Sequence, residues 1–182
     1  MIKDYIYSIN RKYGDEKAKL IPEIPNIVND KYMYKKYEMS NFDAYEIPVC
    51  IRFDNIELAT VNLLHTNLLG IVGGTKSGRN KYVNYALNRI ISNGENAPVD
   101  LYVLDDVTGD LSSFKSCGMY STDISDSARI LDSMYKKVEG RQEKLRTDKQ
   151  ALNTEPLILF VINSNEALNS MTKDSEYLDK FK

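Results

Sequence analysis

The sequence predicts an α/β protein with a mainly parallel sheet flanked by helices and a small N-terminal β-hairpin. Two runs have the composition of buried strands, residues 101–106, whose apolar part ends in two acids, and the strongly apolar residues 156–163. Apolar residues recur at helical spacing in residues 81–91 and 127–146, which lie before and between these runs. Strands that alternate with helices in this way are typical of a parallel sheet.

The remaining predicted elements are shorter. Residues 47–53 and 56–63 alternate between apolar and polar side chains, and the Asp-Asn pair between them predicts a hairpin turn. Residues 68–72, Leu-Leu-Gly-Ile-Val, form a fully apolar run that predicts another buried strand of the parallel sheet. Either Asp123 or Ser125 can cap the long helix that follows, and a polar, helical tail is expected at the C-terminal end.

The first 45 residues differ from the rest of the chain. They contain seven of its 13 tyrosines, and their apolar residues follow neither helical nor strand periodicity well. We predict that residues 1–45 form a lead-in that packs on the core through its tyrosines, or that offers a partner-binding surface. Residues 46–182 then form the domain itself.

Composition places the chain among ordinary globular proteins, because 42% of its 182 residues are apolar and 27% are charged. The formal charge of -2 gives no electrostatic reason to expect nucleic-acid binding. No apolar run approaches the ~20 residues of a membrane span, and no signal peptide is visible. We therefore expect this sequence to form a soluble domain.

The two cysteines and the single histidine offer no catalytic or metal-binding pattern. Cys50 and Cys117 are far apart and lack a C-x-x-C spacing, so buried free thiols are the expected state and a disulfide is the alternative. His65 has no neighbouring cysteine or acidic cluster, which favours a structural role.

The segment with the clearest functional pattern is residues 73–80, Gly-Gly-Thr-Lys-Ser-Gly-Arg-Asn. Phosphate-binding P-loops read G-x-x-x-x-G-K-[ST] between a strand and a helix, and Gly73 and Gly78 occupy the two glycine positions. Arg79 stands in place of the lysine, and Asn80 stands in place of the serine or threonine. The nucleotide-binding residues predicted from this pattern are Gly73, Gly74, Thr75, Lys76, Ser77, Gly78, Arg79 and Asn80.

The two replacements weaken the chemistry of this loop. Glycines let backbone N–H groups surround phosphate oxygens, and a helix N-terminus adds partial positive charge. Arg79 keeps a positive charge but has a planar, bulkier head than lysine. Asn80 offers only an amide oxygen at the position where a hydroxyl ligates Mg²⁺. We therefore expect ATP and Mg²⁺ to bind weakly or not at all, and hydrolysis to be slow or absent.

A P-loop enzyme also needs an acidic residue at the end of a second strand, where it holds Mg²⁺. Two predicted strands compete for this role, since one ends in Asp105 and Asp106 and the more apolar one ends in Asn163. If the strand that ends in Asp105 and Asp106 has this role, the acid that binds Mg²⁺ is kept. If the strand that ends in Asn163 has it, the carboxylate is lost, and the neutral amide in its place cannot act as a base. The two aspartates also suit a general acid/base pair, or a simple acidic turn before Gly109.

The order of these segments resembles the FtsK/SpoIIIE family of P-loop ATPases over roughly residues 20–170. Residues 47–90 resemble the strand and hairpin that lead into that family's P-loop, and residues 101–114 resemble its second strand. Residues 156–168 resemble its Walker B strand, which carries the second acidic residue. Residues 21–25 resemble a linker between tandem modules. Within the family, the likeness is greatest to the last ATPase module of the membrane coupling proteins of type VII secretion.

The resemblance implies a RecA-like P-loop NTPase fold with Asn163 in the Walker B position, which removes the metal-organising acid. It also implies that Arg141 acts as an arginine finger on a neighbouring module, while the residues alone favour an ion pair with Glu143 or another nearby acid. Domains of this family carry further strands after the Walker B strand, so residues 46–182 are expected to lack the last strands.

The function implied by the resemblance is that of a degenerate ATPase module in a membrane-anchored protein, on the cytoplasmic side of the cell membrane. Its partners would be sibling ATPase modules of the same chain and secreted protein substrates, with homo-oligomers formed by the full-length protein. An active ATP-hydrolysing motor with an unusual P-loop is the alternative. DNA translocation is disfavoured by the charge balance.

Overall fold

The computed structural model describes residues 2–14, 23, 26, 28–74 and 76–181. The chain separates into two compact units, of which residues 1–40 and 50–59 form the first and residues 41–49 and 60–182 form the second. The predicted boundary after residue 45 stays a prediction. The segment that resembles a linker, residues 21–25, lies outside the described residues except for residue 23.

The first unit contains helix α1 (Ile2–Tyr13), helix α2 (Asp30–Tyr37) and the tip of a β-hairpin. The side chain of Asn29 accepts a hydrogen bond from a backbone N–H in the first turn of α2 and so caps this helix. The hydroxyl of Tyr37 donates to the carbonyl of Ile56 at 2.7 Å, which ties α2 to the hairpin tip.

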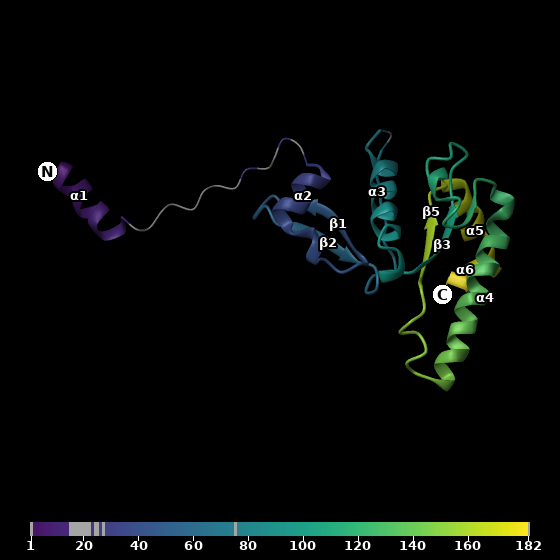
Figure 1. The fold of residues 1–182 in the computed structure, drawn as a ribbon. Coiled ribbons are helices and arrows are strands. Elements are labelled where there is room, and N and C mark those ends of the chain that lie inside the picture. Colours follow the sequence, from purple (N-terminus) through teal and green to yellow (C-terminus); the bar gives the residue numbers. More distant parts are fainter. Residues whose placement is uncertain (1, 15–22, 24–25, 27, 75, 182) are drawn as a thin grey trace. The chain divides into compact units, whose positions relative to one another are not determined.

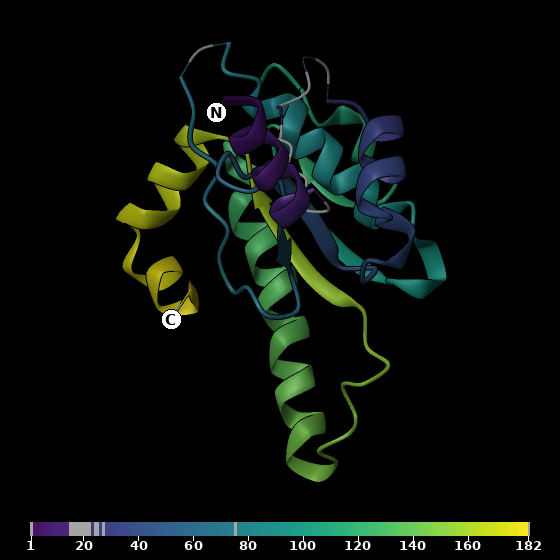
Figure 2. The same cartoon turned by 90° about the vertical axis from the view of Figure 1, so that its left-hand side faces the viewer.

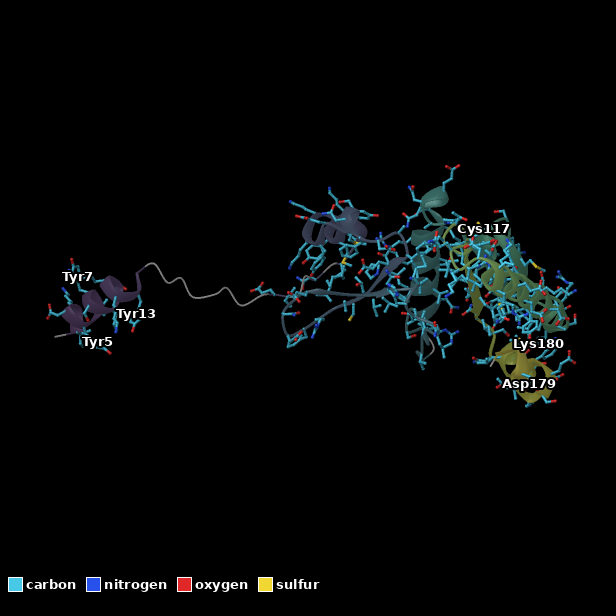
Figure 3. All side chains as sticks on the ribbon, turned by 90° about the horizontal axis from the view of Figure 1, so that it is seen from below. Tyr5, Tyr7, Tyr13, Cys117, Asp179 and Lys180 are labelled. Atoms are coloured by element: carbon cyan, nitrogen blue, oxygen red, sulfur yellow. The ribbon has the colours of Figure 1, made fainter. Side chains whose placement is uncertain are left out.

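The tyrosines that were expected to pack on a core fall into two groups. Tyr37 packs in the first unit, and in the second unit Tyr45 donates to the carbonyl of Pro98 at 3.0 Å. That residues 1–45 as a whole form a lead-in that packs on the core stays a prediction. Helix α1 has no buried residue, and Figure 3 shows side chains projecting from it, among them Tyr5, Tyr7 and Tyr13.

Strands β1 (Glu46–Ile51) and β2 (Leu58–Asn62) pair as the predicted hairpin. The N–H of Arg52 donates to the carbonyl of Glu57 at 2.8 Å and closes the connection between the strands. Ile47 of β1 is buried in the second unit and belongs to its apolar core.

The main sheet has three parallel strands in the order β4-β3-β5. Their bounds are β3 Val99–Leu104, β4 Gly118–Ser121 and β5 Leu157–Ile162. Leu101 of β3 pairs with Gly118 on one side and with Leu159 on the other, which fixes the register. The predicted parallel sheet is confirmed. Strand β4 is an addition that the sequence does not predict, because its four residues include a glycine and a serine.

Helix α3 (Arg79–Ile91) covers one face of the sheet. Its buried Leu87 clusters with Val103 of β3. Leu111 and Phe114, from the connection between β3 and β4, complete this apolar layer. The helix predicted directly after the glycine loop is therefore confirmed.

The opposite face is covered by three helices, α4 (Ser127–Thr147), α5 (Asn165–Lys173) and α6 (Ser175–Phe181). Ile130 and Leu131 of α4 and Met171 of α5 cluster there with Tyr102 and Leu104. Side chains that alternate between two helical layers explain why β5 and the part of β3 from Leu101 to Leu104 are apolar. Figure 1 shows α3 on one side of β3 and β5 and α4, α5 and α6 on the other, and Figure 2 shows α4 running along β5.

Short 3-10 turns link these elements, at Met39–Asn41, Gly94–Asn96, Ser112–Phe114 and Ile124–Asp126. The side chain of Asp123 accepts a hydrogen bond from the Ser125 N–H at 2.9 Å and caps the last of these turns. The N-cap of α4 itself is Asp126, which makes no side-chain capping hydrogen bond, so neither Asp123 nor Ser125 caps this helix as the sequence predicts.

The apolar run of residues 68–72 is not a strand, contrary to the sequence prediction. Leu68 and Val72 are 89% and 97% exposed, and no strand of the described residues pairs with this run. Apolar composition alone cannot form a strand, because backbone N–H and C=O groups need a neighbouring strand as their hydrogen-bond partner. The run therefore enters the glycine loop as irregular, solvent-exposed chain.

The isolated cysteines and histidine lie on the surface. Cys50 and Cys117 are free, as predicted, but both are exposed, so the predicted burial is wrong. Cys117 belongs to the turn before β4, where no core surrounds it. His65 is exposed in the turn after β2, and its N–H donates to the carbonyl of Asn62 at 3.2 Å. None of the helices among the described residues has the length and apolar character needed to cross a membrane.

Candidate functional site

The glycine loop leads into the N-terminus of α3, so the helix that the P-loop pattern requires is present, whereas the strand that it requires before the loop is absent from residues 68–72. Gly78 is the N-cap of α3, and its φ of 88° lies in the left-handed region that favours glycine. A Cβ atom on Gly73 would lie 2.3 Å from the hydroxyl of Ser77, so a larger residue there would require the Ser77 side chain to move. The N–H of Ser77 donates to the carbonyl of Gly74 at 3.1 Å. Thr75, one of the predicted binding residues, lies outside the described residues.

The loop has the features of an anion cradle with limited chemistry. The side chain of Lys76 is exposed, and its φ of 62° gives the loop a second left-handed residue. Backbone N–H groups of such a turn, together with the free N–H groups of a helix start, can surround a phosphate. Among the described residues, these groups and the charges of Lys76 and Arg79 are the ones that could hold a nucleotide phosphate.

The side chains of Arg79 and Asn80 form hydrogen bonds with other side chains of the protein. Arg79 Nε donates to the side-chain oxygen of Asn80 at 3.2 Å. The amide nitrogen of Asn80 donates to the carboxylate of Asp110, and Asn84 donates to the backbone carbonyl of the same aspartate at 3.0 Å. Asn80, which stands where a P-loop enzyme has its Mg²⁺-binding hydroxyl, therefore has its oxygen and its nitrogen engaged by protein groups.

A buried carboxylate at the end of β3 organises the neighbouring strand ends. Asp105 is 3% exposed, and its Oδ2 accepts hydrogen bonds from the Leu111 N–H at 2.7 Å and from the Tyr120 hydroxyl at 2.8 Å. Its Oδ1 accepts from the side-chain amide of Asn163 and from the N–H of Asp106, each at 2.8 Å. Burial, and then the bond to Asp105, raise the pKa of Tyr120 above its usual value.

The structure brings together the two strand ends that compete in the sequence for the acidic role. The N–H of Asn163 donates to the carbonyl of Leu104 at 2.8 Å, so Asn163 follows β5 directly beside Asp105. Asn80 contacts Asp110, and Asp105 contacts the next residue, Leu111. The chain therefore connects the hydrogen bonds of Asn80 directly with those of Asp105. These polar groups form what we term the strand-end network, made of Asn80, Asp105, Asp110, Leu111, Tyr120 and Asn163.

Three members of this network cannot be recognised in the sequence, namely Leu111, which contributes a backbone N–H, and the side chains of Asp110 and Tyr120. Asp110 and Tyr120 carry no motif, and their role depends on contacts with residues distant in sequence. A usable signal would be the spacing of acids in residues 105–110, Asp-Asp-Val-Thr-Gly-Asp, after a buried strand. In parallel sheets the carboxyl ends of the strands lie at the same edge, so acids that directly follow a buried strand are expected to lie at that edge.

Asp106 forms the acidic turn that the sequence offers as an alternative to an acid/base pair. Its side chain accepts a hydrogen bond from the Thr108 N–H at 3.1 Å, and its carbonyl accepts from the Gly109 N–H at 2.9 Å. Gly109 has a φ of 67°, which completes the turn. Asp105 and Asp106 therefore differ in role, since one is a buried acceptor and the other shapes a surface turn.

Arg141 forms ion pairs within the chain. Its Nη2 donates to the carboxylate of Asp100 at 2.8 Å, and its side chain is 13% exposed. Its Nε lies 3.5 Å from a carboxylate oxygen of Glu155 but lacks hydrogen-bond geometry. Lys144, followed by the charge of Arg141, lowers the pKa of Glu155. The acidic partners are thus Asp100 and Glu155 rather than Glu143, and the arginine-finger role stays a prediction.

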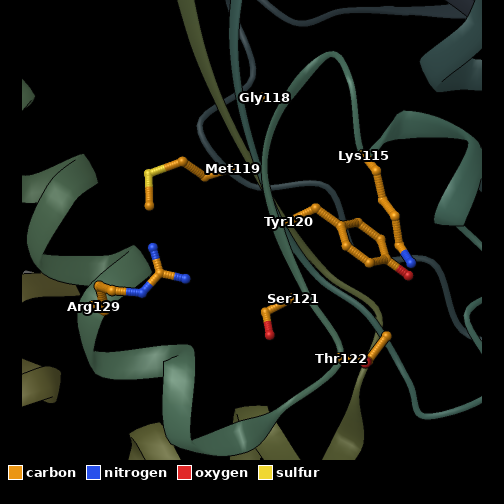
Figure 4. A pocket seen from close by; sticks show the side chains of 7 residues that line it. All are labelled: Lys115, Gly118, Met119, Tyr120, Ser121, Thr122 and Arg129. Carbon is orange, nitrogen blue, oxygen red and sulfur yellow. The ribbon is translucent and has the colours of Figure 1, made fainter.

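The described residues contain no group of three or more His, Cys, Asp or Glu side chains that could hold a metal ion. A hollow of about 460 Å³ lies away from the glycine loop, along the outer side of β4 (Figure 4). It is lined by residues of β4 and by two basic side chains, Lys115 and Arg129. Sequence analysis does not predict this hollow, because it depends on β4 being the outermost strand.

Comparisons with protein-family models, with curated proteins and with solved structures find no match to this chain.

Proposed function

We propose that this chain is a degenerate P-loop ATPase module of the FtsK/SpoIIIE type with a RecA-like fold, closest to the C-terminal ATPase module of the type VII secretion coupling protein EssC. In this proposal the module recognises secreted protein substrates and regulates sibling ATPase modules on the cytoplasmic side of the membrane. It binds ATP weakly or not at all, and it hydrolyses little or none.

The observation that carries this proposal is a pair of amides in the strand-end network. Asn80 and Asn163 stand where a P-loop enzyme places its Mg²⁺-binding hydroxyl and its Walker B acid. Each amide donates a hydrogen bond to a carboxylate, Asn80 to Asp110 and Asn163 to Asp105. Mg²⁺ requires oxygen ligands in near-octahedral geometry, and it binds poorly where N–H donors already satisfy the acids. This arrangement favours a site that keeps its shape without a metal ion.

The glycine loop supports the phosphate-binding part of the proposal. Gly78 caps α3 in a left-handed conformation, and the loop before it curls back through the Ser77 to Gly74 hydrogen bond. A helix start of this kind attracts anions without any catalytic side chain. The module would therefore retain weak affinity for the phosphates of a nucleotide after losing the groups that organise Mg²⁺.

Two measurements on the purified chain test the ATPase part of the proposal. Calorimetric titration with ATP and Mg²⁺ is expected to show weak binding or none, and phosphate release should not exceed that of the Arg79→Ala variant. Lys149→Ala is the matched control, since Lys149 is an exposed cation outside the loop. Turnover that Arg79→Ala abolishes, while Lys149→Ala preserves it, would replace this proposal with an active motor that drives export.

The recognition role needs a separate experiment. A peptide from the C-terminus of a secreted substrate is titrated against the chain alone and against the chain together with its sibling ATPase modules. Saturable binding is expected in at least one of these mixtures. Absence of binding in both would remove the recognition role, whatever the nucleotide measurements show.

A further inference from the structure

Strand β4 leaves one backbone edge of the sheet open. In a parallel sheet, successive residues direct their N–H and C=O groups to opposite neighbours. The carbonyl of Ser121 accepts from the Asp105 N–H at 2.9 Å, so this residue faces β3. Tyr120 and Gly118, which alternate with it, then direct their backbone groups away from β3. No strand of the described residues pairs with that edge.

The hollow beside this edge is lined by cations and no acid. Its lining includes Gly118, Tyr120 and Thr122 along the chain, with Lys115 and Arg129 beside them. None of its lining residues is an aspartate or glutamate. Figure 4 shows the guanidinium of Arg129 on one side of the strand and the ammonium of Lys115 on the other. We term this region the β4 edge.

The side chain of Arg129 is positioned by a hydrogen bond from only one of its three guanidinium nitrogens. Its Nε donates to one carboxylate oxygen of Asp126 at 3.0 Å, and the other oxygen accepts from the Ser121 hydroxyl at 2.8 Å. Arg129, followed by Ser121, lowers the pKa of Asp126. The hydrogen bonds of the described residues leave the two terminal amino groups of Arg129 available, and these are the groups that bind a carboxylate in a fork.

Lys115 and Arg129 flank opposite faces of the strand. The Lys115 ammonium lies 5.1 Å from the ring centroid of Tyr120, whose side chain packs in the layer of α3. Arg129 belongs to α4, and Met119 packs in the layer of that helix. A strand added to this edge would place successive side chains alternately near each cation, because side chains alternate between the faces of a sheet.

We propose that the β4 edge binds an extended, acidic segment of a partner polypeptide by strand addition. Backbone groups of Gly118 and Tyr120 hydrogen-bond to the segment, and Lys115 and Arg129 each bind one of its carboxylates. Because these cations lie on opposite faces, the two acids occupy neighbouring positions of the segment. Acids separated by one residue would lie on the same face and reach only one cation. This inference is independent of the function proposed for the glycine loop.

Two labelled peptides of identical composition test the spacing rule by fluorescence anisotropy. One carries two acidic residues side by side in an extended, Thr- and Val-rich sequence, and the other has them separated by one residue. The first is expected to bind roughly tenfold more tightly, because it forms one more charged hydrogen-bonded pair. Lys115→Glu and Arg129→Glu should each weaken its binding by roughly tenfold or more. Lys149→Glu, the same charge reversal at an exposed site elsewhere, should leave it unchanged.

Hydrogen exchange on the full chain separates strand addition from simple charge attraction. Bound peptide should slow exchange of the Tyr120 amide, whose N–H faces the open edge. Equal binding of both peptides, absence of binding, or binding without protection of this amide would each overturn the proposal. In those cases the two cations act only as charges that keep an open edge from pairing with other chains.

Discussion

Two polar regions of the second unit satisfy their charged groups in opposite ways. In the strand-end network, Asp105 and Asp110 accept hydrogen bonds from Asn163, Asn80 and backbone N–H groups of the same chain. At the β4 edge, Lys115 has no acidic partner among the described ion pairs, although its ammonium lies over a tyrosine ring. The carboxylates of the first region are satisfied within the chain, whereas in the second the Lys115 ammonium and the terminal amino groups of Arg129 have no acceptor among the described residues.

The difference between the two regions separates a structural role for charged groups from a binding role. A carboxylate that is already satisfied by protein donors has little to gain from a metal ion, so it acts as a structural acceptor. Cations and backbone groups that face solvent lose little when a partner replaces water. The contrast supports the proposal that the module has given up metal chemistry and interacts with other polypeptides.

The largest effect on stability is expected from Asn163→Asp. This change replaces the hydrogen-bonded pair of the Asn163 amide and the Asp105 carboxylate, which we call the matched pair, by two adjacent carboxylates. The free energy of unfolding should fall by about 3 kcal/mol at neutral pH, because a buried charge loses its donor and meets a like charge. Repulsion raises the folded-state pKa of the pair, so the folded state binds more protons than the unfolded state. The lost stability should therefore return as the pH falls toward about 4. Urea unfolding across pH measures this.

Asn169→Asp is the control for this change, since Asn169 is exposed on α5 and makes no side-chain hydrogen bond among those described. It should change stability by less than about 0.5 kcal/mol. A swapped pair, Asp105→Asn with Asn163→Asp, should recover part of the loss by restoring one amide and one carboxylate. If Asn163→Asp were as stable as the parent at neutral pH without metal, the matched pair would not be what holds the strand ends together.

Gly118→Ala tests the strand that connects the two regions. A Cβ at this position would lie 2.1 Å from the Leu101 carbonyl oxygen, so β4 would have to move away from β3. We expect a loss of roughly 2 kcal/mol in thermal or urea unfolding. Gly140→Ala in α4 is the control, because a Cβ there has nothing within 4 Å and should stabilise the helix by about 1 kcal/mol. Equal effects of the two substitutions would argue against the close pairing of β4 and β3.

Tyr120→Phe removes one donor from the strand-end network and should cost about 1–2 kcal/mol at neutral pH. The raised pKa of Tyr120 adds a pH signature. Above about pH 10 the unfolded phenol loses its proton while the folded one keeps it, so parent stability falls as the pH rises. The variant should show a shallower alkaline loss in chemical denaturation than the parent. An identical alkaline slope in both proteins would contradict the bond to Asp105.

The smallest stability effect is expected at the β4 edge. Lys115→Glu should change the free energy of unfolding by less than about 0.5 kcal/mol, because the side chain lies at the surface and forms no ion pair among those described. Binding of the acidic peptide should fall in the same variant. A large loss of stability with Lys115→Glu would show that the β4 edge is structural, as the strand-end network is.

Local pattern in the sequence predicts most of the elements around the candidate site. The apolar residues 101–104 and 157–162 lie in β3 and β5 because continuous apolar side chains suit a strand between two helical layers. The helix after the glycine loop follows from its apolar spacing, and Gly78 at its start follows from the left-handed turn that the loop needs. These features depend on neighbours in the chain, so they can be inferred without the fold.

Contacts between distant segments required the tertiary structure. Residues 68–72 have the composition of a strand, but no strand of the described residues pairs with them. The four residues of β4 have low strand propensity, yet they form a strand because they pair with β3. From the sequence, Asp105 and Asn163 are alternative residues for the acidic position of a P-loop enzyme. The register of β3 and β5 places them side by side, and they form a hydrogen bond. The same holds for Asn80 with Asp110 and for Arg141 with Asp100. A hydrogen bond across the fold depends on register and crossover direction, which local residue preferences do not encode.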